Sequence, residues 1–355
     1  MVEPSSVVLA AGGTAGHVFP ALAIYDALDA RGVTVHLFSD ERGLAYMNDI
    51  DRSRVTVVPS GGLVTGTLRK RAGNLAKLVS GSFLARRALR ERSPDLVIGL
   101  GGYPSVGPLL AARQLGIPTI LHEQNSVMGV ANKVTARSAN AVALSFDPTE
   151  GAVGTCHITG NPSRASIVAI GDAPYRGVDA SESIRALVMG GSQGARSISD
   201  RVPAALGGLR QELRSRLRVV HQARPEDNDR VVAAYAGHNI DATVEKFVDV
   251  PAVLPSTHLV IARSGATTVA EVAVARRPAV YLPLLTHRDL QQVKNATAVA
   301  DAGGALVLRE DETDVATLTA AIEPLLSEPE RLATMADAAR AWSRPDAVDS
   351  ILQLL

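Results

Sequence analysis

The polar residues between positions 259 and 295 have the types and spacing that a nucleotide-sugar site requires. An apolar run at 259–262 predicts a short buried strand, a sharp turn follows at 263–265, and a helix is expected to begin near Ala266. The N–H groups and the positive dipole end of such a helix suit a diphosphate. Glu271 falls one turn inside this helix, where its carboxylate can accept hydrogen bonds from both hydroxyls of a ribose. The alternative is a capped helix with a surface carboxylate.

A pair of amides follows the same stretch. Gln291 and Gln292 come after a second predicted strand at 279–282 and a loop at 283–290. Amide side chains offer donors and acceptors together, as sugar hydroxyls require. With Glu271 and the helix start, the two amides predict a nucleotide-sugar pocket.

Two more glycine-rich turns follow predicted strands, at 11–17 (AGGTAGH) and at 190–195 (GGSQGA). Neither matches the dinucleotide fingerprint or a P-loop, and a tight turn can need glycine for steric reasons alone. His17, at the end of the first turn, is a candidate general base; the alternative is a helix N-terminal histidine without chemistry. Three such turns at carboxyl ends of strands favour a binding function, because ligands of doubly wound sheets bind there.

A further polar group, His122-Glu123-Gln124-Asn125, comes directly after an apolar run at 119–121. Four polar side chains at the carboxyl end of a strand favour a functional loop over a structural one. Glu123 is the second candidate base, because its carboxylate can accept a proton.

Strands that alternate with helical patterns position these groups. This alternation predicts parallel sheets covered by helices on both faces, in an α/β protein with two Rossmann-like domains facing a cleft. We expect an N-terminal domain at 1–160, a C-terminal domain at 161–340, and a C-terminal segment at 341–355 whose helix packs back on the first domain. The predicted strands lie at 7–10, 33–38, 55–58, 96–99, 119–121 and 141–144, then at 186–189, 217–220, 259–262, 279–282 and 305–308, with a weaker one at 242–244.

The composition excludes several classes of protein. Lys plus Arg equals Asp plus Glu at 36 each, so no global field favours nucleic acid or a membrane. The one cysteine, Cys156, excludes an internal disulfide. Residues 1–6 contain Glu3 and run into a strand, which predicts no signal peptide. We therefore expect a cytoplasmic protein, soluble or peripheral to the membrane.

Several motifs together resemble one family, MurG, the lipid I N-acetylglucosaminyltransferases. They occur in family order over nearly the whole chain: AAGGTAGHVFPALA from Ala10, GGYPS from Gly101, HEQNSV from His122, then Asn132-Lys133, GNPSR from Gly160, GGSQGA from Gly190 and RSGATTVAE from Arg263 with the later QQ. The resemblance implies a GT-B glycosyltransferase whose N-terminal domain takes the lipid acceptor and whose C-terminal domain takes UDP-GlcNAc. The implied reaction moves GlcNAc to the C4 hydroxyl of the N-acetylmuramoyl unit of lipid I, with inversion at C1, to give lipid II.

The resemblance also implies the site residues. His17 is the implied base, with Glu123 as runner-up. The implied substrate contacts are Thr14, Ala15, Gly16, Asn125, Arg164, Ser192, Val248, Ala266, Thr267, Thr268, Val269, Ala270, Glu271, Gln291 and Gln292. Helix N-termini can hold the charge on departing UDP, so neither a cofactor nor a metal is expected. One departure is Arg277, where the family often has Gly; we expect it to alter only a surface turn.

Three alternatives stay open: another GT-B glycolipid transferase such as a diacylglycerol galactosyltransferase, a UDP-sugar epimerase, and a nucleotide-sugar sensor. The family also implies lipid I as partner, the cytoplasmic face of the cell membrane as location, and other cell-wall synthesis and division proteins as further partners.

A basic segment at 69–92 predicts the membrane contact. Its apolar residues, among them Leu75, Leu78, Val79 and Phe83, mostly fall on one helical stripe. This stripe reads either as ordinary core below a solvated charged face or as an apolar patch that binds an anionic membrane surface. The charged residues are Arg69, Lys70, Arg71, Lys77, Arg86, Arg87, Arg90 and Arg92 against the acid Glu91.

Overall fold

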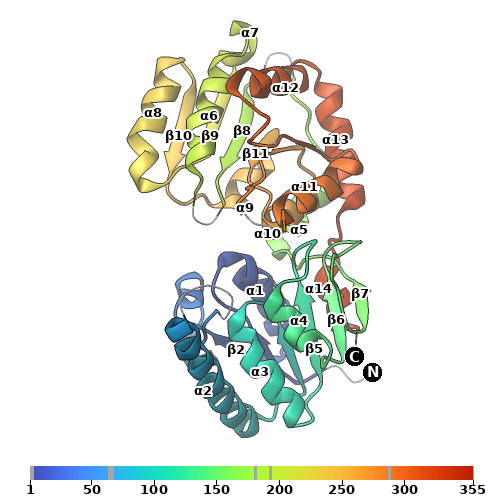
Figure 1. Cartoon of the computed structure of the whole chain (residues 1–355). Coiled ribbons are helices and arrows are strands. Elements are labelled where there is room, and N and C mark those ends of the chain that lie inside the picture. The colour runs from blue at the N-terminus through green and yellow to red at the C-terminus, as the bar shows by residue number, and fades with distance from the viewer. Residues whose placement is uncertain (1–3, 63–67, 180–181, 192–193, 287–288, 355) are drawn as a thin grey trace. The chain divides into compact units, whose positions relative to one another are not determined.

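The chain folds into two α/β units, each built on its own parallel sheet (Figure 1). The computed structural model describes residues 4–62, 68–179, 182–191, 194–286 and 289–354. Unit 1 comprises Met1–Ala165 and Pro345–Leu355, and unit 2 comprises Ser166–Arg344. The expected boundaries, at 160 and 340, lie a few residues before these.

Unit 1 has a sheet of seven parallel strands in the order β3-β2-β1-β4-β5-β6-β7. The strands are β1 (Ser6–Ala10), β2 (Thr34–Ser39), β3 (Val55–Val57), β4 (Leu96–Gly99), β5 (Thr119–Glu123), β6 (Ala141–Leu144) and β7 (Cys156–Ile158). The helices are α1 (Ala15–Asp29), α2 (Leu68–Arg92), α3 (Tyr103–Gln114), α4 (Val130–Ala136) and α14 (Ala347–Leu352).

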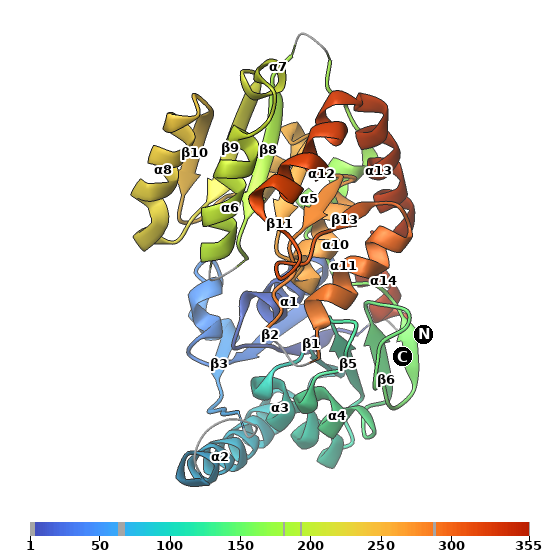
Figure 2. The same cartoon turned by 45° about the horizontal axis from the view of Figure 1, so that its top comes forward.

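The sheet of unit 1 separates two cores. Because successive side chains of a strand point to opposite faces, Val7 and Leu9 pack with α1 and α14, whereas Val8 and Ala10 pack with α2 and α3. Figure 2 shows α2, α3 and α4 along one side of the sheet and α1 along the other. Burial on both faces explains why the central strands read as continuous apolar runs.

The last helix, α14, belongs to unit 1 and packs against α1. Ile351 is fully buried in the core that α1 covers, and Val348 and Leu352 pack against it. Arg31, just beyond α1, forms an ion pair with Asp349. The chain therefore returns to its first unit after completing the second.

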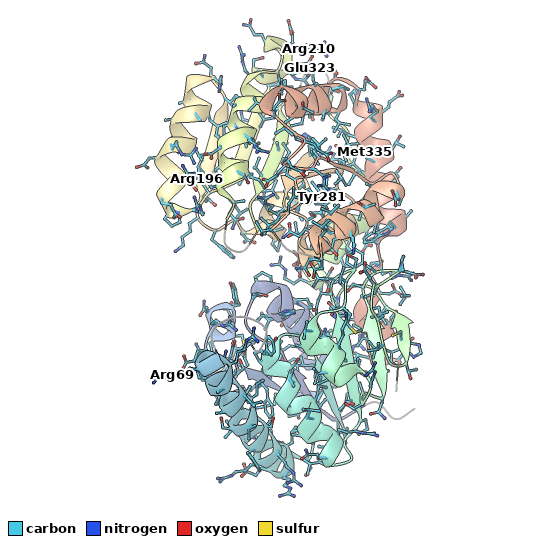
Figure 3. All side chains as sticks on the ribbon, in the orientation of Figure 1. Arg69, Arg196, Arg210, Tyr281, Glu323 and Met335 are labelled. Atoms are coloured by element: carbon cyan, nitrogen blue, oxygen red, sulfur yellow. The ribbon has the colours of Figure 1, made fainter. Side chains whose placement is uncertain are left out.

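Unit 2 has a sheet of six parallel strands in the order β10-β9-β8-β11-β12-β13. The strands are β8 (Ile184–Met189), β9 (Leu217–Gln222), β10 (Asp241–Glu245), β11 (Leu259–Ala262), β12 (Ala279–Tyr281) and β13 (Ala305–Val307). The helices are α5 (Ala165–Asp172), α6 (Arg196–Gly207), α7 (Gln211–Arg214), α8 (Asn228–Gly237), α9 (Val250–Val253), α10 (Ala266–Val274), α11 (Gln291–Asp301), α12 (Val315–Ser327) and α13 (Pro329–Trp342). Tyr281 is fully buried, and Met335 of α13 packs in the core of unit 2 (Figure 3).

Both sheets reverse their strand order at an equivalent place, between β1 and β4 in unit 1 and between β8 and β11 in unit 2. In doubly wound sheets, ligands bind outside the carboxyl ends of the strands at this switch point. The turns at 11–14 and 100–102 flank it in unit 1. In unit 2 it is flanked by residues 190–191 and 194–195 and by the turn at 263–265. The predicted fold class, two parallel-sheet α/β domains, is confirmed.

Arg277 is a correction to the sequence analysis. It was expected in a surface turn, but it is 5% exposed. Its guanidinium donates to the carbonyls of Leu254 at 2.8 Å, Ala275 at 3.0 Å and Pro255 at 3.1 Å, and it lies over the Tyr175 ring at 5.7 Å. Burial lowers its pKa. Arg277 therefore joins the end of α10 to the segment before β11, where a glycine could not.

Candidate functional site

The predicted site residues fall into two groups, one in each unit. The first surrounds the turn between β1 and α1, which is held by Asp40, the residue after β2. Asp40 Oδ1 accepts hydrogen bonds from the N–H groups of Gly13 at 2.8 Å and Gly43 at 3.0 Å. Gly12 needs to be glycine, because a Cβ there would lie 2.7 Å from the same oxygen.

The charge on Asp40 fits this anchoring role. Burial alone would raise its pKa, but the hydrogen bonds from Gly13, Gly43 and Arg42 outweigh burial and lower it. Asp40 was not among the residues predicted from the sequence. Its signal was an acidic residue directly after the strand that pairs with β1.

His17 lies in the first turn of α1 with its ring half-buried. Its Nδ1 is 3.0 Å from Oε1 of Gln124. A Cβ at Gly101 would lie 3.0 Å from His17 Nδ1, and one at Gly102 would lie 3.2 Å from its Cδ2. Both glycines have positive φ, 84° and 73°, so the turn before α3 closes over the imidazole as only glycine permits. The structure thus brings three predicted motifs together around His17.

Glu123, the second candidate base, is tied within its own loop. Oε1 accepts from Asn125 N–H at 2.9 Å, and Oε2 accepts from Gly129 N–H at 2.9 Å and from Asn132 Nδ2 at 2.8 Å. Glu123 is 2% exposed. These bonds hold the loop that leads into α4, so the contacts favour His17 over Glu123 as the base. The choice between them stays a prediction.

The other predicted residues of unit 1 gather at the start of α1. Thr14 is the exposed N-cap, Ala15 is buried and Gly16 is half-buried. The Arg164 guanidinium lies 5.3 Å from the centre of the Phe19 ring, one turn further along α1. A helix start and a cation therefore lie near one another within this unit.

The second group is built on the turn between β11 and α10. Gly265 is the N-cap in extended conformation, with φ −61° and ψ 143°. Ser264 Oγ donates to the carbonyl of Gln292 at 2.7 Å, and Asn295 Nδ2 donates to the carbonyl of Ser264 at 3.2 Å. These bonds bring the start of α11 to the start of α10, as the nucleotide-sugar prediction requires.

The side chains of this group differ in exposure. Glu271 is 7% exposed on α10. Oε1 of Gln292 accepts from Leu284 N–H at 2.9 Å, so its amide N–H groups are the part that can donate to a sugar hydroxyl. Val248 is 4% exposed, in the segment after β10. On α10, Ala266, Val269 and Ala270 are buried and Thr267 and Thr268 half-buried; Gln291 is half-buried at the start of α11, and Ser192 lies outside the described residues.

Arg263, the first residue of this turn, was not predicted as a site residue, but its buried guanidinium holds the turn in place. It is 6% exposed, and it donates to the carbonyl of Leu282 at 2.7 Å and to Ser197 Oγ at 2.7 Å. Its Nη2 also lies 2.8 Å from Oε1 of Glu310. One guanidinium thus connects the turn before α10, the end of β12, the start of α6 and the segment after β13. The signal was a basic residue directly after an apolar strand.

In the part of the chain that the structure describes, no cluster brings together three or more His, Cys, Asp or Glu side chains that could hold an ion. Two Asp-X-Asp triplets occur, at 49–51 and 227–229. Asp51 caps a short turn at Ser53, and Asp227 is paired with Arg224 and Arg230.

Two domains of one protein family match consecutive parts of the chain. Residues 7–144 match the glycosyltransferase family 28 N-terminal domain, and residues 185–351 match the glycosyltransferase family 28 C-terminal domain. A protein of Agrobacterium fabrum named UDP-N-acetylglucosamine–N-acetylmuramyl-(pentapeptide) pyrophosphoryl-undecaprenol N-acetylglucosamine transferase is 41% identical over 352 residues, covering 98% of this chain and 93% of its own. A relative of the same name from Paramagnetospirillum magneticum is 42% identical over 355 residues, covering 98% and 95%.

Solved structures give the same fold. The crystal structure of Acinetobacter baumannii MurG is 30% identical, with a TM-score of 0.78 over 99% of both chains. A UDP-N-acetylglucosamine 2-epimerase structure has a TM-score of 0.69 over 99% of this chain and 95% of its own. Its identity is 13%, so it shares the fold alone.

Proposed function

The chain belongs to glycosyltransferase family 28 and, within it, to the MurG family, and we propose that it transfers N-acetylglucosamine from UDP-GlcNAc to lipid I, which gives lipid II. One observation carries this proposal: identity of 41–42% across 98% of the chain with transferases named for these substrates. The C4 hydroxyl of the N-acetylmuramoyl unit attacks C1 of the donor sugar, the bond to the diphosphate breaks, and C1 is inverted.

The donor half of the proposed site belongs to unit 2. The N–H groups at the start of α10 and the dipole of this helix would hold the diphosphate. Glu271 would accept hydrogen bonds from the ribose hydroxyls, and Gln291 and Gln292 would bind the sugar. Val248 and Ser192 complete the proposed donor contacts in this unit.

The acceptor half belongs to unit 1. A hydroxyl is a weak nucleophile at neutral pH, and a histidine can take its proton as the new bond forms. We assign this role to His17, with Asn125, Arg164 and the turn at 14–16 as further donor contacts. Helix N-termini and backbone N–H groups would hold the charge that UDP gains on leaving, so we propose transfer without a metal or cofactor.

Incubation with UDP-GlcNAc, with and without a lipid I analogue, separates the candidate functions. Release of UDP that depends on the acceptor, with a disaccharide product, is the expected result. Conversion of the sugar without an acceptor would instead identify an epimerase, as the fold likeness to such enzymes allows. Binding without turnover would identify a sensor.

A lipid-borne acceptor calls for a membrane contact, and we propose that α2 supplies it. Of its apolar residues, Leu75, Val79 and Phe83 are 53%, 49% and 69% exposed and recur every four residues. Leu78 is 9% exposed and lies seven residues before Ala85, a residue of the core that α2 covers, so it shares the core-facing side of the helix. The sequence predicted one apolar stripe on this helix, but the structure separates exposed Leu75, Val79 and Phe83 from buried Leu78. The exposed stripe is therefore not part of the core.

The charge around the exposed stripe supports an anionic partner surface. Arg87 continues the four-residue spacing after Phe83, and Lys77, Arg87 and Arg90 are exposed. Each basic residue near an anionic leaflet contributes about 1 kcal/mol, and shallow burial of the apolar side chains adds to this. In the described part of the chain, every helix is either too short or too polar to cross a bilayer. The exposed apolar stripe and the basic residues around it support our proposal of peripheral attachment, at the cytoplasmic face of the cell membrane.

Sedimentation with liposomes tests the membrane contact. Binding should require anionic lipid and weaken with salt. The triple change of Leu75, Val79 and Phe83 to Ser should abolish it, whereas Val232→Ser, at a residue 45% exposed on α8 of unit 2, should leave it unchanged. A folded triple variant that sediments like the parent would exclude α2 as the contact.

A further inference from the structure

A line of hydrogen bonds runs from His17 into the core of unit 1. His17 Nδ1 faces Oε1 of Gln124 at 3.0 Å, and Gln124 Nε2 faces Nδ1 of His122 at 2.9 Å. His122 Nε2 faces the carbonyl of Gly160 at 3.0 Å. Gln124 is 1% exposed and His122 is fully buried. Neither residue has a role in the function proposed above, although Gln124 contacts the proposed base and His122 contacts Gln124.

Two backbone carbonyls set the direction of every bond in this line. Gln124 Nε2 also lies 2.7 Å from the carbonyl of Leu100, which can only accept, so this end of the amide is its N–H₂ group and Oε1 faces His17. The carbonyl of Gly160 likewise can only accept, so His122 Nε2 carries a hydrogen. Because burial lowers the pKa of His122 to about 4, its ring is neutral and its Nδ1 accepts from Gln124.

The same argument determines which nitrogen of His17 carries a hydrogen. An amide oxygen can only accept, so the atom that faces it at 3.0 Å, His17 Nδ1, has to carry a hydrogen. We propose that Gln124 is a positioning residue that holds His17 as the Nδ1–H tautomer, which leaves the lone pair on Nε2 to take the acceptor's proton. This inference rests on the proposed role of His17 as base, and it names the atom that does the chemistry and the residue that selects it.

The backbone at Gly101 packs closely against the hydrogen bond between His17 and Gln124. A Cβ at Gly101 would lie 3.0 Å from His17 Nδ1 and 3.2 Å from Gln124 Oε1, so the backbone already fills the space beside the bond. The ring nitrogen that hydrogen-bonds to a fixed partner is the one that determines the tautomer of a histidine. Where such a partner imposes the wrong tautomer on a catalytic histidine, kcat falls by about 10⁴-fold, as in serine proteases. In this protein the fixed partner of Nδ1 is the amide oxygen of Gln124.

The tautomer can be measured without substrate. In protein labelled with ¹⁵N-histidine, two-bond proton–nitrogen correlation distinguishes Nδ1–H from Nε2–H rings, and comparison with His17→Gln identifies the His17 signals. We expect neutral His17 to have a protonated Nδ1 and a bare Nε2. An Nε2–H ring in the unaltered protein would overturn the proposal, whether or not any variant folds.

Two variants then test the part that Gln124 plays. Gln124→Leu keeps the volume but removes the acceptor, so His17 should shift towards the Nε2–H form and kcat should fall roughly 10–100-fold, part of what a general base provides, while the KM for UDP-GlcNAc changes little. The control, Ser145→Ala, removes a 3.3 Å contact to His122 Nε2 and leaves the amide in place. It should keep the Nδ1–H form. Retention of that form in folded Gln124→Leu would contradict the proposal.

These outcomes separate the tautomer from the proposed function. An Nδ1–H ring in a protein without acceptor-dependent UDP release would leave the positioning intact and refute the transferase. Transferase activity with an Nε2–H ring would support the proposed function and refute the positioning role of Gln124.

Discussion

The buried ion pair between Arg263 and Glu310 gives a prediction whose size follows from the structure. The two side chains are 8% and 17% exposed, with Nη2 and Oε1 2.8 Å apart. At an effective dielectric constant near 20, attraction at this distance is about 6 kcal/mol, and desolvation offsets much of it. Oε1 of Glu310 accepts no hydrogen bond within the described part of the chain, so its contact with Nη2 is ionic. We expect a coupling free energy of about 1.5–3 kcal/mol.

The perturbation is a double-mutant cycle with Arg263→Met and Glu310→Ala. Arg263→Met alone should lower the free energy of unfolding by about 3–5 kcal/mol, because it leaves a partly buried carboxylate and the carbonyl of Leu282 without their partner. The chain has one tryptophan, Trp342, and it lies in unit 2. Urea unfolding followed by its fluorescence therefore reports on the unit that holds the pair.

A matched pair in the same unit provides the control. Arg218 and Asp241 are 2.9 Å apart, but their side chains are 47% and 67% exposed. Solvent screens such a pair, and its coupling should be about 0–1 kcal/mol. If the buried pair coupled no more strongly than the exposed one, Arg263 would not hold the turn before α10 in the way described.

The remaining predictions concern three single residues. Glu271→Ala should weaken UDP binding by roughly 1.5–3 kcal/mol, and Glu271→Gln by less, because Gln keeps one acceptor; calorimetric titration measures both, and unchanged affinity would remove Glu271 from the site. Asp40 has a lowered pKa, so its stabilisation is present above the unfolded pKa of about 3.9 and is lost as pH falls through the folded value. Asp40→Asn should flatten the acid limb of unfolding, and an identical limb would refute this. Gly101→Ala should cost about 1–2 kcal/mol of backbone strain and also reduce turnover through His17, whereas Gly32→Ala, at a φ of 77° with open space around it, should cost strain alone. Equal turnover in the two alanine variants would contradict the packing of Gly101 on His17.

The strands were predictable because most are buried on both faces and read as apolar runs. The expected bounds at 96–99, 141–144 and 259–262 are those of β4, β6 and β11. β7 was missed because it is a three-residue edge strand with exposed Cys156 and His157, which leave no apolar run. The glycine turns were also predictable, because they directly follow the ends of the predicted strands.

The anchoring residues were not predictable in the same way. Arg277 and Arg263 are held by carbonyls from segments distant in sequence, and nothing in local spacing reveals which carbonyls those are. On α2, spacing alone merged Leu78 with exposed neighbours, because it shows periodicity but not which stripe the rest of the unit covers. Gln124 was visible as part of a polar loop, but its role depends on the carbonyl of Leu100.

We propose that His17 takes the acceptor's proton during transfer, and single-turnover kinetics with His17→Ala test this role. Preloaded UDP-GlcNAc is mixed with a lipid I analogue, and disaccharide formation is followed while donor affinity is measured separately. We expect a rate about 10²–10⁴-fold below that of the unaltered protein, with donor affinity nearly unchanged. A loss of less than tenfold in the folded variant would contradict it and would move the role of base to another residue, with Glu123 the next to change.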